Sequence, residues 1–298
     1  MENFILIVVA IVIGYGLNRF RIFPEDAAAI LNKFVIFISL PAMILLQIPK
    51  LTFSMDIMIP VIIAWVVMIL TAILTLFISK LFHFSKEVTG ALMLVAVLTN
   101  SSFLGIPIIN AYLGDESLPF ILVYDQLGTF LALATYGIFV AAYYSNTSEI
   151  NVQIMVVKIL TFPPFISLIL ALFFIGTPFP DVILKVLSTL ANTIVPIALV
   201  AVGLQLQLKL PSHEIKPFGM ALFIKLLVAP MIALVIVKIT GWTNLAASVS
   251  VMEAGMAPMI TAGAMASLSG LAPRLSSAIV GYGILISFFT TAVLVKFI

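Results

Sequence analysis

The chain has 298 residues, of which 63% are hydrophobic and only 9% charged, and its mean hydropathy is +1.30. A chain of this composition cannot present a water-soluble surface, so we predict an all-α polytopic protein embedded in a lipid bilayer. Zero cysteines exclude disulfides and thiolate-bound metals, and a net charge of +2 without a basic, aromatic-rich patch indicates no nucleic-acid partner.

Ten apolar segments follow one another along the chain, each close to the roughly 20 residues that a membrane-spanning helix needs. The connections between them are only a few residues long, so we expect one membrane domain and no soluble domain. The predicted transmembrane helices cover residues 3–18, 26–48, 56–82, 87–112, 118–144, 152–176, 181–208, 214–239, 245–269 and 273–297.

The basic residues predict the orientation of these helices. Arg19 and Arg21 follow the first segment and none precedes it, which indicates an uncleaved first helix rather than a signal peptide. Four basic residues fall on the side of the N-terminus and ten on the other, so the positive-inside rule predicts an inner-membrane protein with both termini outside the cytoplasm. The four are Lys50, Lys185, Lys238 and Lys296, and the ten are Arg19, Arg21, Lys33, Lys80, Lys86, Lys158, Lys209, Lys216, Lys225 and Arg274.

The fourth and ninth predicted helices are interrupted in the same way, by a polar or charged residue followed by a glycine and then a proline. Proline removes a backbone donor, and lipid offers no partner for the freed groups, so such breaks survive only where they line a cavity or are buried in protein. In transporters these breaks mark the substrate site. The residues are Asn100, Ser101, Ser102, Gly105 and Pro107 in the first interruption and Glu253, Gly255 and Pro258 in the second.

Proline spacing indicates an internal repeat. Pro41 of the second predicted helix lies 66 residues before Pro107, and Pro196 of the seventh lies 62 residues before Pro258. Each half has five predicted helices, an odd number, so the second half enters the membrane from the opposite side. If helices 4 and 9 cross near the midplane, their half-helix N-termini favour an anionic substrate. The two inverted five-helix repeats are predicted to cover residues 1–148 and 149–298.

Three polar residues lie well inside the fifth predicted helix: Asp125, Gln126 and Thr129. An ionised carboxylate at this depth costs about 2.5–3.5 kcal/mol on insertion scales, so something must offset it. We interpret Asp125 as a proton or cation site, with Gln126 beside it and Thr129 one turn later on the same face. The alternative is a structural carboxylate bonded to a neighbouring helix.

Other polar residues near the breaks have two interpretations each. Glu253 precedes a break that frees backbone carbonyls and is either a cation ligand or proton carrier, or a carboxylate that satisfies N–H groups of the crossed helix. Asn100, Ser101 and Ser102 either donate to a substrate carboxylate or cap the second half-helix. Asn192, one turn before the proline of the seventh helix, either faces the cavity or packs between helices.

Four motifs, in this order, resemble the auxin efflux carrier family: Ser39-Leu40-Pro41-Ala42, residues 98–107, residues 124–129 and residues 253–258. The resemblance covers essentially the whole chain. It implies ten transmembrane helices with crossed helices 4 and 9, a fold related to bile acid:sodium symporters and to sodium/proton antiporters, and a homodimer. It also implies export or exchange of carboxylates such as malate and malonate, or of auxin-like acids. By likeness to the bile acid symporters, Glu253 with Asn100 or Ser101 is the implied sodium site.

We therefore expect a secondary transporter of small organic anions that works by alternating access at the helix 4/9 crossing, coupled to sodium or protons through Glu253 and Asp125. An uncoupled facilitator is the alternative within transport. A membrane receptor would need a signalling extension, and an intramembrane hydrolase a second catalytic group; neither is visible. No nucleotide-binding or histidine-based metal motif occurs, so we expect no enzyme activity and no cofactor beyond the coupling ion.

Overall fold

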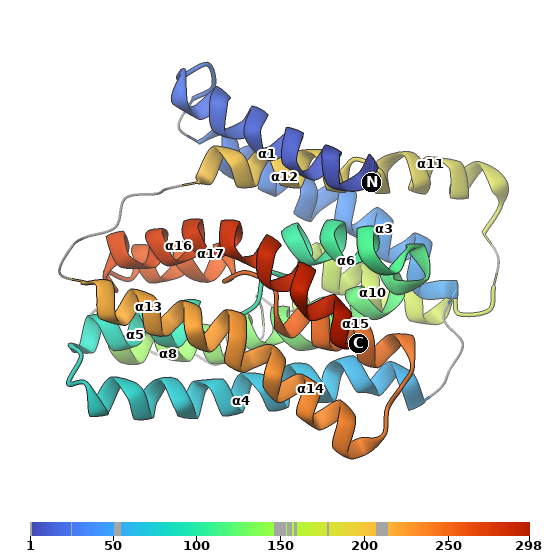
Figure 1. Cartoon of the computed structure of the whole chain (residues 1–298). Helices are drawn as coiled ribbons and strands as arrows, with labels where there is room; N and C mark the ends of the chain where they lie inside the picture. Colours follow the sequence, from blue (N-terminus) through green and yellow to red (C-terminus); the bar gives the residue numbers. More distant parts are fainter. Residues whose placement is uncertain are drawn as a thin grey trace.

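The computed structural model describes residues 2–24, 26–50, 55–145, 153, 157, 160–177, 179–206 and 214–298, and every regular element in this part of the chain is helical (Figure 1). Six helical stretches are long and apolar enough to cross a membrane: Ala27–Lys50, Met58–Leu81, Asp115–Tyr144, Asp181–Gln205, Ile215–Thr240 and Pro273–Phe297. Shorter apolar helices accompany them at Ile5–Arg19, Ser101–Leu113, Pro163–Phe173 and Leu245–Ala254. The chain is therefore a multi-pass membrane protein, as its composition predicts.

The regular elements of the described residues follow one another along the chain in this order. From the N-terminus to the middle of the chain they are α1 (Glu2–Arg19), α2 (Ala27–Phe34), η1 (Val35–Ser39), α3 (Leu40–Gln47), η2 (Ile48–Lys50), η3 (Met55–Ile57), α4 (Met58–Leu81), α5 (Lys86–Val95), η4 (Ser101–Gly105), α6 (Ile106–Leu113), η5 (Asp115–Ser117), α7 (Leu118–Val123), η6 (Tyr124–Phe130), η7 (Leu133–Gly137) and α8 (Ile138–Tyr144). The second part contains α10 (Pro163–Phe173), α11 (Asp181–Ala191), α12 (Ile194–Gln205), α13 (Ile215–Phe223), η9 (Ile224–Val228), α14 (Ala229–Thr240), α15 (Leu245–Ala254), α16 (Ile260–Leu268), α17 (Pro273–Leu294) and η10 (Val295–Phe297).

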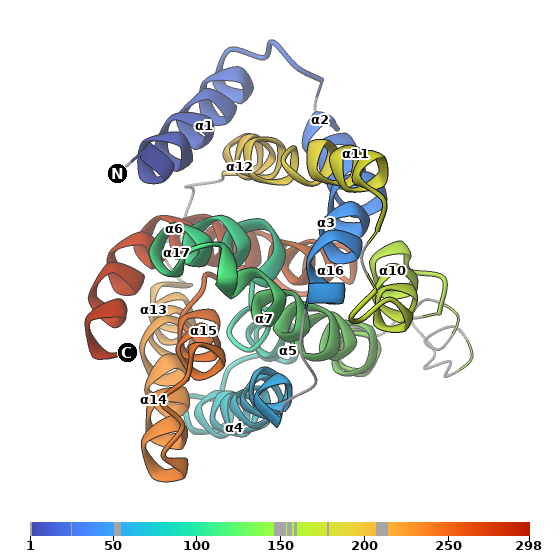
Figure 2. The ribbon, with the colours of Figure 1, turned by 90° about the vertical axis from the view of Figure 1, so that its right-hand side faces the viewer.

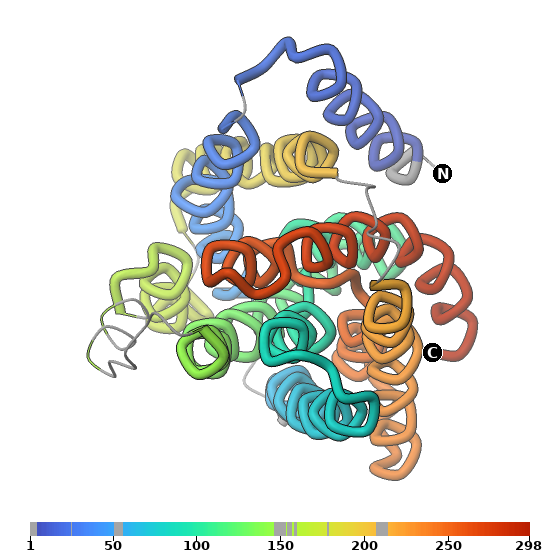
Figure 3. The backbone as a smooth tube through the Cα atoms, turned by 90° about the vertical axis from the view of Figure 1, so that its left-hand side faces the viewer, coloured from blue at the N-terminus to red at the C-terminus, as the bar shows by residue number. Residues whose placement is uncertain are grey.

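The helices form two groups; Figures 1 and 2 show α1, α11 and α12 of the first group above the second group, and α10 of the first group beside it. We call α1–α3 with α10–α12 the panel, and α4–α8 with α13–α17 the bundle. Both parts of the chain contribute in the same order, first to the panel and then to the bundle, and the tube in Figure 3 follows this order. The predicted boundary between the repeats, at residues 148 and 149, lies outside the described residues.

Within the panel, α1 packs directly on α12 through two glycines. A Cβ atom on Gly14 would lie 2.2 Å from the carbonyl oxygen of Val200, and one on Gly203 would lie 2.2 Å from that of Ile11. Small residues of this kind allow helix backbones to approach closely within a membrane, where van der Waals packing drives association. This contact holds α1 against α12 within the panel.

The prolines that the sequence pattern singles out as breaks lie mostly inside helices. Pro41 and Pro107 lie inside continuous helices, just after the π-helical segments η1 and η4 pass into α3 and α6, and Pro196 lies in the first turn of α12. Inside a continuous helix a proline removes one backbone hydrogen bond, whereas in a first turn, as at Pro196, the N–H that it lacks would have no partner within the helix. Only Pro258 lies in an interruption itself, so proline marks the neighbourhood of each break rather than its position.

Candidate functional site

The two interrupted helices meet backbone to backbone in the bundle. Residues 96–100 separate α5 from η4, and residues 255–259 separate α15 from α16. The Asn100 N–H donates to the Ala257 carbonyl at 3.0 Å, and the Met259 N–H donates to the Leu98 carbonyl at 3.0 Å, around an isolated antiparallel bridge. This pairing satisfies backbone groups that lipid would leave without a partner. It also brings the residues beside both interruptions into one region.

Lys225 connects the two interruptions. Its side chain is fully buried, and its Nζ atom donates to the Thr99 hydroxyl at 2.6 Å and to the Ala254 carbonyl at 3.1 Å. Counting Lys225 among interfacial residues that report on topology is therefore wrong. Its position near the middle of an apolar stretch was the available signal, because an ionisable residue at membrane depth marks a functional site.

Glu253 lies in the last turn of α15 and is fully buried. Its carboxylate packs on Gly105, where an added Cβ would lie 2.5 Å from Oε1. Neither carboxylate oxygen has a hydrogen-bond partner among the described residues, although the charges of Lys225 and Asp125 act on it. A buried group without partners is costly, which makes Glu253 a candidate for binding a proton or an ion.

Asp125 accepts hydrogen bonds from three side chains. The Ser101 hydroxyl, the Ser102 hydroxyl at 2.5 Å and the Gln126 Nε2 at 2.6 Å all donate to its carboxylate. Ser101 begins η4, so Asp125 lies where the partial positive charge of a helix N-terminus favours an anion. The sequence predicts that Ser101 and Ser102 bind a substrate or cap a half-helix. In the structure their hydroxyls donate instead to Asp125.

A cavity of about 100 Å³ adjoins these residues and lies between the panel and the bundle; we call it the central cavity. Three buried atoms of residues that line it have no hydrogen-bond partner among the described residues: Asn100 Nδ2, Gln126 Oε1 and Thr261 Oγ1. Its other lining residues are Ile36, Leu40, Ser101, Ser102, Phe103, Asp125, Phe130, Leu133, Phe162 and Met259. Free polar groups beside apolar walls are typical of small-molecule sites.

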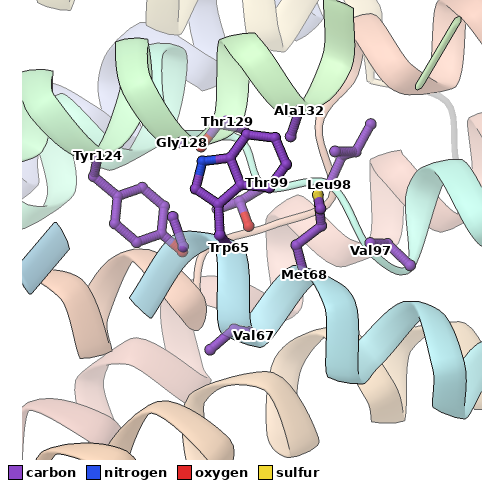
Figure 4. Close-up of a pocket in the computed structure, with 11 residues that line it drawn as sticks. Trp65, Val67, Met68, Val97, Leu98, Thr99, Tyr124, Gly128, Thr129 and Ala132 are labelled. Carbon is purple, nitrogen blue, oxygen red and sulfur yellow. The ribbon is translucent and has the colours of Figure 1, made fainter. Parts of the chain in front are cut away.

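A second, much smaller cavity of about 20 Å³ adjoins Thr99 on the side of α4. Figure 4 shows Trp65, Thr99 and Tyr124 around it, together with Thr129. This volume suffices for about one water molecule. Thr129 therefore lines this cavity, and it is absent from the lining of the central cavity.

Asn192 lies apart from the central cavity. It is exposed and lines an open cavity of about 440 Å³ with Lys50, Asn110 and Asp115. The described residues contain no group of three or more His, Cys, Asp or Glu side chains that could hold a metal. Of the residues predicted to bind sodium, Ser101 donates to Asp125, whereas Glu253 packs on Gly105. Thr261 is the lining residue that sequence reasoning missed.

Comparison with known proteins agrees with this architecture. The chain is 28% identical over 266 residues to an uncharacterized transporter of Methanocaldococcus jannaschii, covering 86% of this chain and 85% of that protein. It is 25% identical over 268 residues to an uncharacterized transporter of Methanothermobacter thermautotrophicus, covering 89% and 87%. The family model described as "Membrane transport protein" matches residues 1–295. The chain therefore belongs to this family of membrane transporters, which includes the auxin efflux carriers.

Proposed function

We propose that the protein is a secondary transporter of small organic anions, carboxylates such as malate and malonate or auxin-like acids, and that it binds them in the central cavity. One observation carries this proposal: three buried polar atoms without partners, on Asn100, Gln126 and Thr261, belong to the lining of one cavity beside two paired helix interruptions. Irregular backbone at membrane depth and unsatisfied buried groups are both costly, and a bound substrate offsets them.

Transport in this proposal proceeds by movement of the bundle against the panel. Two open cavities support it, because both lie between the two groups and at opposite ends of α12. The cavity that contains Asn192 includes Val195, and the other, of about 470 Å³, includes Leu204 and Gln205. Val195 and Leu204 are nine residues apart, or roughly 14 Å along a helix. The helix α12 also contacts η4.

The distribution of basic residues gives the proposed orientation of the protein in the membrane. Two inverted repeats with crossed helices 4 and 9 would present the central cavity to each side of the inner membrane in turn, with both termini outside the cytoplasm. The homodimer that the family resemblance implies would form through the panel. The shared order of panel and bundle helices in the two parts of the chain supports the repeat.

Coupling in this proposal involves Glu253 and Asp125, and a proton is favoured over sodium. Sodium would require carbonyl and hydroxyl oxygens near Glu253. Lys225 already donates to the Ala254 carbonyl, and Ser101 already donates to Asp125. The electrostatic interaction between Lys225 and Glu253 also favours a second candidate, an uncoupled facilitator in which these charges balance each other.

Uptake into proteoliposomes tests the proposal. The purified protein should accumulate radiolabelled malate, malonate or benzoate faster than protein-free vesicles. Asn100→Leu should remove at least nine-tenths of this uptake, because it deletes a polar group of the central cavity. Asn32→Leu, in α2 and outside the cavities described above, is the matched control and should transport normally. Normal transport by Asn100→Leu would contradict the site, and no uptake of any carboxylate would contradict the substrate class.

A further inference from the structure

The hydrogen-bonding groups of the central cavity differ in kind. Asn100 Nδ2 is a donor, Gln126 Oε1 is an acceptor, and the Thr261 hydroxyl is either. An ionised carboxylate has two acceptor oxygens and no hydrogen to donate. It would satisfy Asn100 but would place an oxygen against the Gln126 acceptor. The cavity therefore discriminates between protonation states of an acid.

While Asp125 is ionised, its carboxylate fixes the orientation of the Gln126 amide. Its Nε2 donates to Asp125 Oδ2 at 2.6 Å, and a carboxylate accepts hydrogen bonds but offers none when ionised. Turning the amide over would place two oxygens together at this short distance. Gln126 is fully buried, so no bulk water relieves such a contact. Oε1 is consequently the atom of Gln126 that is left for a ligand.

Thr261 brings the N-terminus of α16, which supplies hydrogen-bond donors, to the cavity wall. Thr261 is the second residue of α16, a nine-residue helix whose N-terminus has no side-chain cap. The first N–H groups of a helix have no partner within it and favour an acceptor oxygen. Together with Asn100 Nδ2 they suit one carbonyl oxygen of a ligand. Gln126 Oε1, from η6 in the same cavity lining, then requires a donor on the second atom of the same group.

The charges near the cavity also disfavour an anionic ligand. Asp125 is the one charged residue among those that line it, and no lysine or arginine belongs to this lining. The hydroxyls of Ser101 and Ser102, which would otherwise attract a substrate anion, donate to Asp125 itself. From the neighbouring elements, η9 contributes Lys225 and α15 contributes Glu253, and neither lines the cavity.

We propose that the central cavity binds the neutral, protonated form of a small monocarboxylic acid, whose C=O accepts from Asn100 and whose O–H donates to Gln126. The aromatic side chains of Phe103, Phe130 and Phe162 then surround the apolar part of the acid. This inference rests on the proposed transport function and names the form in which the substrate binds. A second anionic group would meet Asp125 without any cation in the cavity wall. The inference therefore narrows the proposed substrates to monocarboxylic acids and disfavours malate and malonate.

The proton balance of such a transporter is simple. On one side of the membrane the carboxylate takes a proton from hydronium and leaves water, and the neutral acid enters the cavity. On the other side the acid returns the proton to water. One carboxylate and one proton cross together and no net charge moves. The proton is carried on the acid, which replaces proton coupling through Glu253 and Asp125, and both of these residues keep their protonation states.

Ligand binding to the purified full-length protein tests this inference, with the unfolding temperature as the measurement, because ligands that bind the native state raise it. Benzoic acid and benzamide are the probes, since benzamide is a neutral isostere with an N–H donor in place of the O–H. Benzamide should stabilise the protein equally from acidic to weakly alkaline pH. The affinity for benzoic acid should fall about tenfold for each pH unit above the ligand's own pKa, as its neutral fraction falls.

A stronger acid of nearly the same shape, 2,6-difluorobenzoic acid, separates titration of the ligand from titration of Asp125, Glu253 or Lys225. If the proton is on the ligand, the pH profile moves to lower pH by the difference between the two ligand pKa values. Coincident profiles for the two acids would mean that a protein group titrates, and would overturn the proposal. Failure of benzamide to stabilise the protein would overturn it as well.

Two variants test whether Gln126 is the residue that selects the neutral form of the ligand. Gln126→Met removes the acceptor and should weaken benzamide binding at least tenfold, whereas Gln153→Met, at an exposed glutamine, should not. Asp125→Asn frees the Gln126 amide to turn its NH₂ group into the cavity, so benzoate should bind with weaker pH dependence. An unchanged pH profile in the folded Asp125→Asn protein would contradict the proposal.

The outcomes separate this inference from the proposed function. Carboxylates that bind and are transported with no loss of affinity at alkaline pH, without any effect of benzamide, would leave the transporter of organic anions standing and exclude the neutral form. Benzamide binding that depends on Gln126, in a protein that transports no carboxylate, would support the donor–acceptor site and exclude the proposed function.

Discussion

The Nζ atom of Lys225 lies 2.6 Å from the Thr99 hydroxyl, and the same atom donates to the carbonyl of Ala254, so one side chain joins both interrupted helices. Lys225→Met should lower the unfolding temperature, because it leaves both acceptors without this donor, at about 1–3 kcal/mol for each group left unsatisfied. Differential scanning fluorimetry of the detergent-purified variants measures this loss.

Glu253 provides the second part of this experiment. Lys225 and Glu253 interact electrostatically and are both fully buried, so their substitutions should not be additive. The double variant Lys225→Met/Glu253→Gln should be more stable than the sum of the single losses predicts, by roughly 0.5–3 kcal/mol. Additive losses would show that the two residues stabilise the fold independently, and that Lys225 does not compensate the charge of Glu253.

Gly105 should not tolerate alanine. The added methyl group would lie 2.5 Å from Glu253 Oε1 and 2.8 Å from Oε2, so the carboxylate or the helix must move. We expect Gly105→Ala to reduce substrate binding and the unfolding temperature together. Gly219→Ala is the matched control, because nothing lies within 4 Å of that position and alanine is the better helix former by about 1 kcal/mol. Equal behaviour of the two variants would show that Gly105 does not position Glu253.

Gly203 should not tolerate a larger side chain either, for a different reason. Its added Cβ would meet backbone of α1, 2.2 Å from the Ile11 carbonyl and 2.8 Å from the Tyr15 nitrogen, and backbone cannot turn aside as a flexible side chain can. Gly203→Val should therefore separate α1 from α12 and lower the unfolding temperature, more than Gly219→Val does in α13. Ligand affinity in the protein that remains folded should change little, because the central cavity takes no residue from α1. Loss of affinity without loss of stability would contradict this division between panel and site.

Sodium should not drive transport. Lys225 already supplies a positive charge beside the Ala254 carbonyl, and Ser101 is engaged by Asp125. Replacing sodium by potassium on both sides of proteoliposomes should leave the initial rate of benzoate uptake unchanged within about twofold, a difference of about 0.4 kcal/mol. A rate that falls tenfold or more in potassium would require a sodium site and would contradict the favoured coupling.

The sequence was sufficient to predict the membrane class, the two interruptions and most of the polar residues that line the central cavity. Composition determines the membrane class. An apolar run broken by polar residues, glycine and proline identifies each interruption. Asn100, Asp125 and Gln126 were each predicted as binding-site residues, and all three line the central cavity. Their common signal is a polar side chain where lipid would otherwise surround the helix.

Other parts of the site depend on packing that local sequence does not encode. Thr261 resembles any other threonine until the pairing of residues 98–100 with 257–259 places the N-terminus of α16 beside the cavity. Thr129 lies four residues after Asp125 and five after Tyr124, and only the position of α4 decides which cavity it lines. Lys225 has a clear signal at membrane depth, but counting charges for topology assigned it to an interface.

The absence of cysteine from the chain allows the central claim to be tested by labelling one introduced thiol. Thr261→Cys places it in the central cavity, and Ser267→Cys places it in the separate open cavity at the C-terminal end of α12. Benzoic acid at acidic pH should slow maleimide labelling of Thr261→Cys several-fold and leave Ser267→Cys unaffected. Unchanged labelling of Thr261→Cys, in a protein that still takes up benzoate, would show that the substrate binds elsewhere.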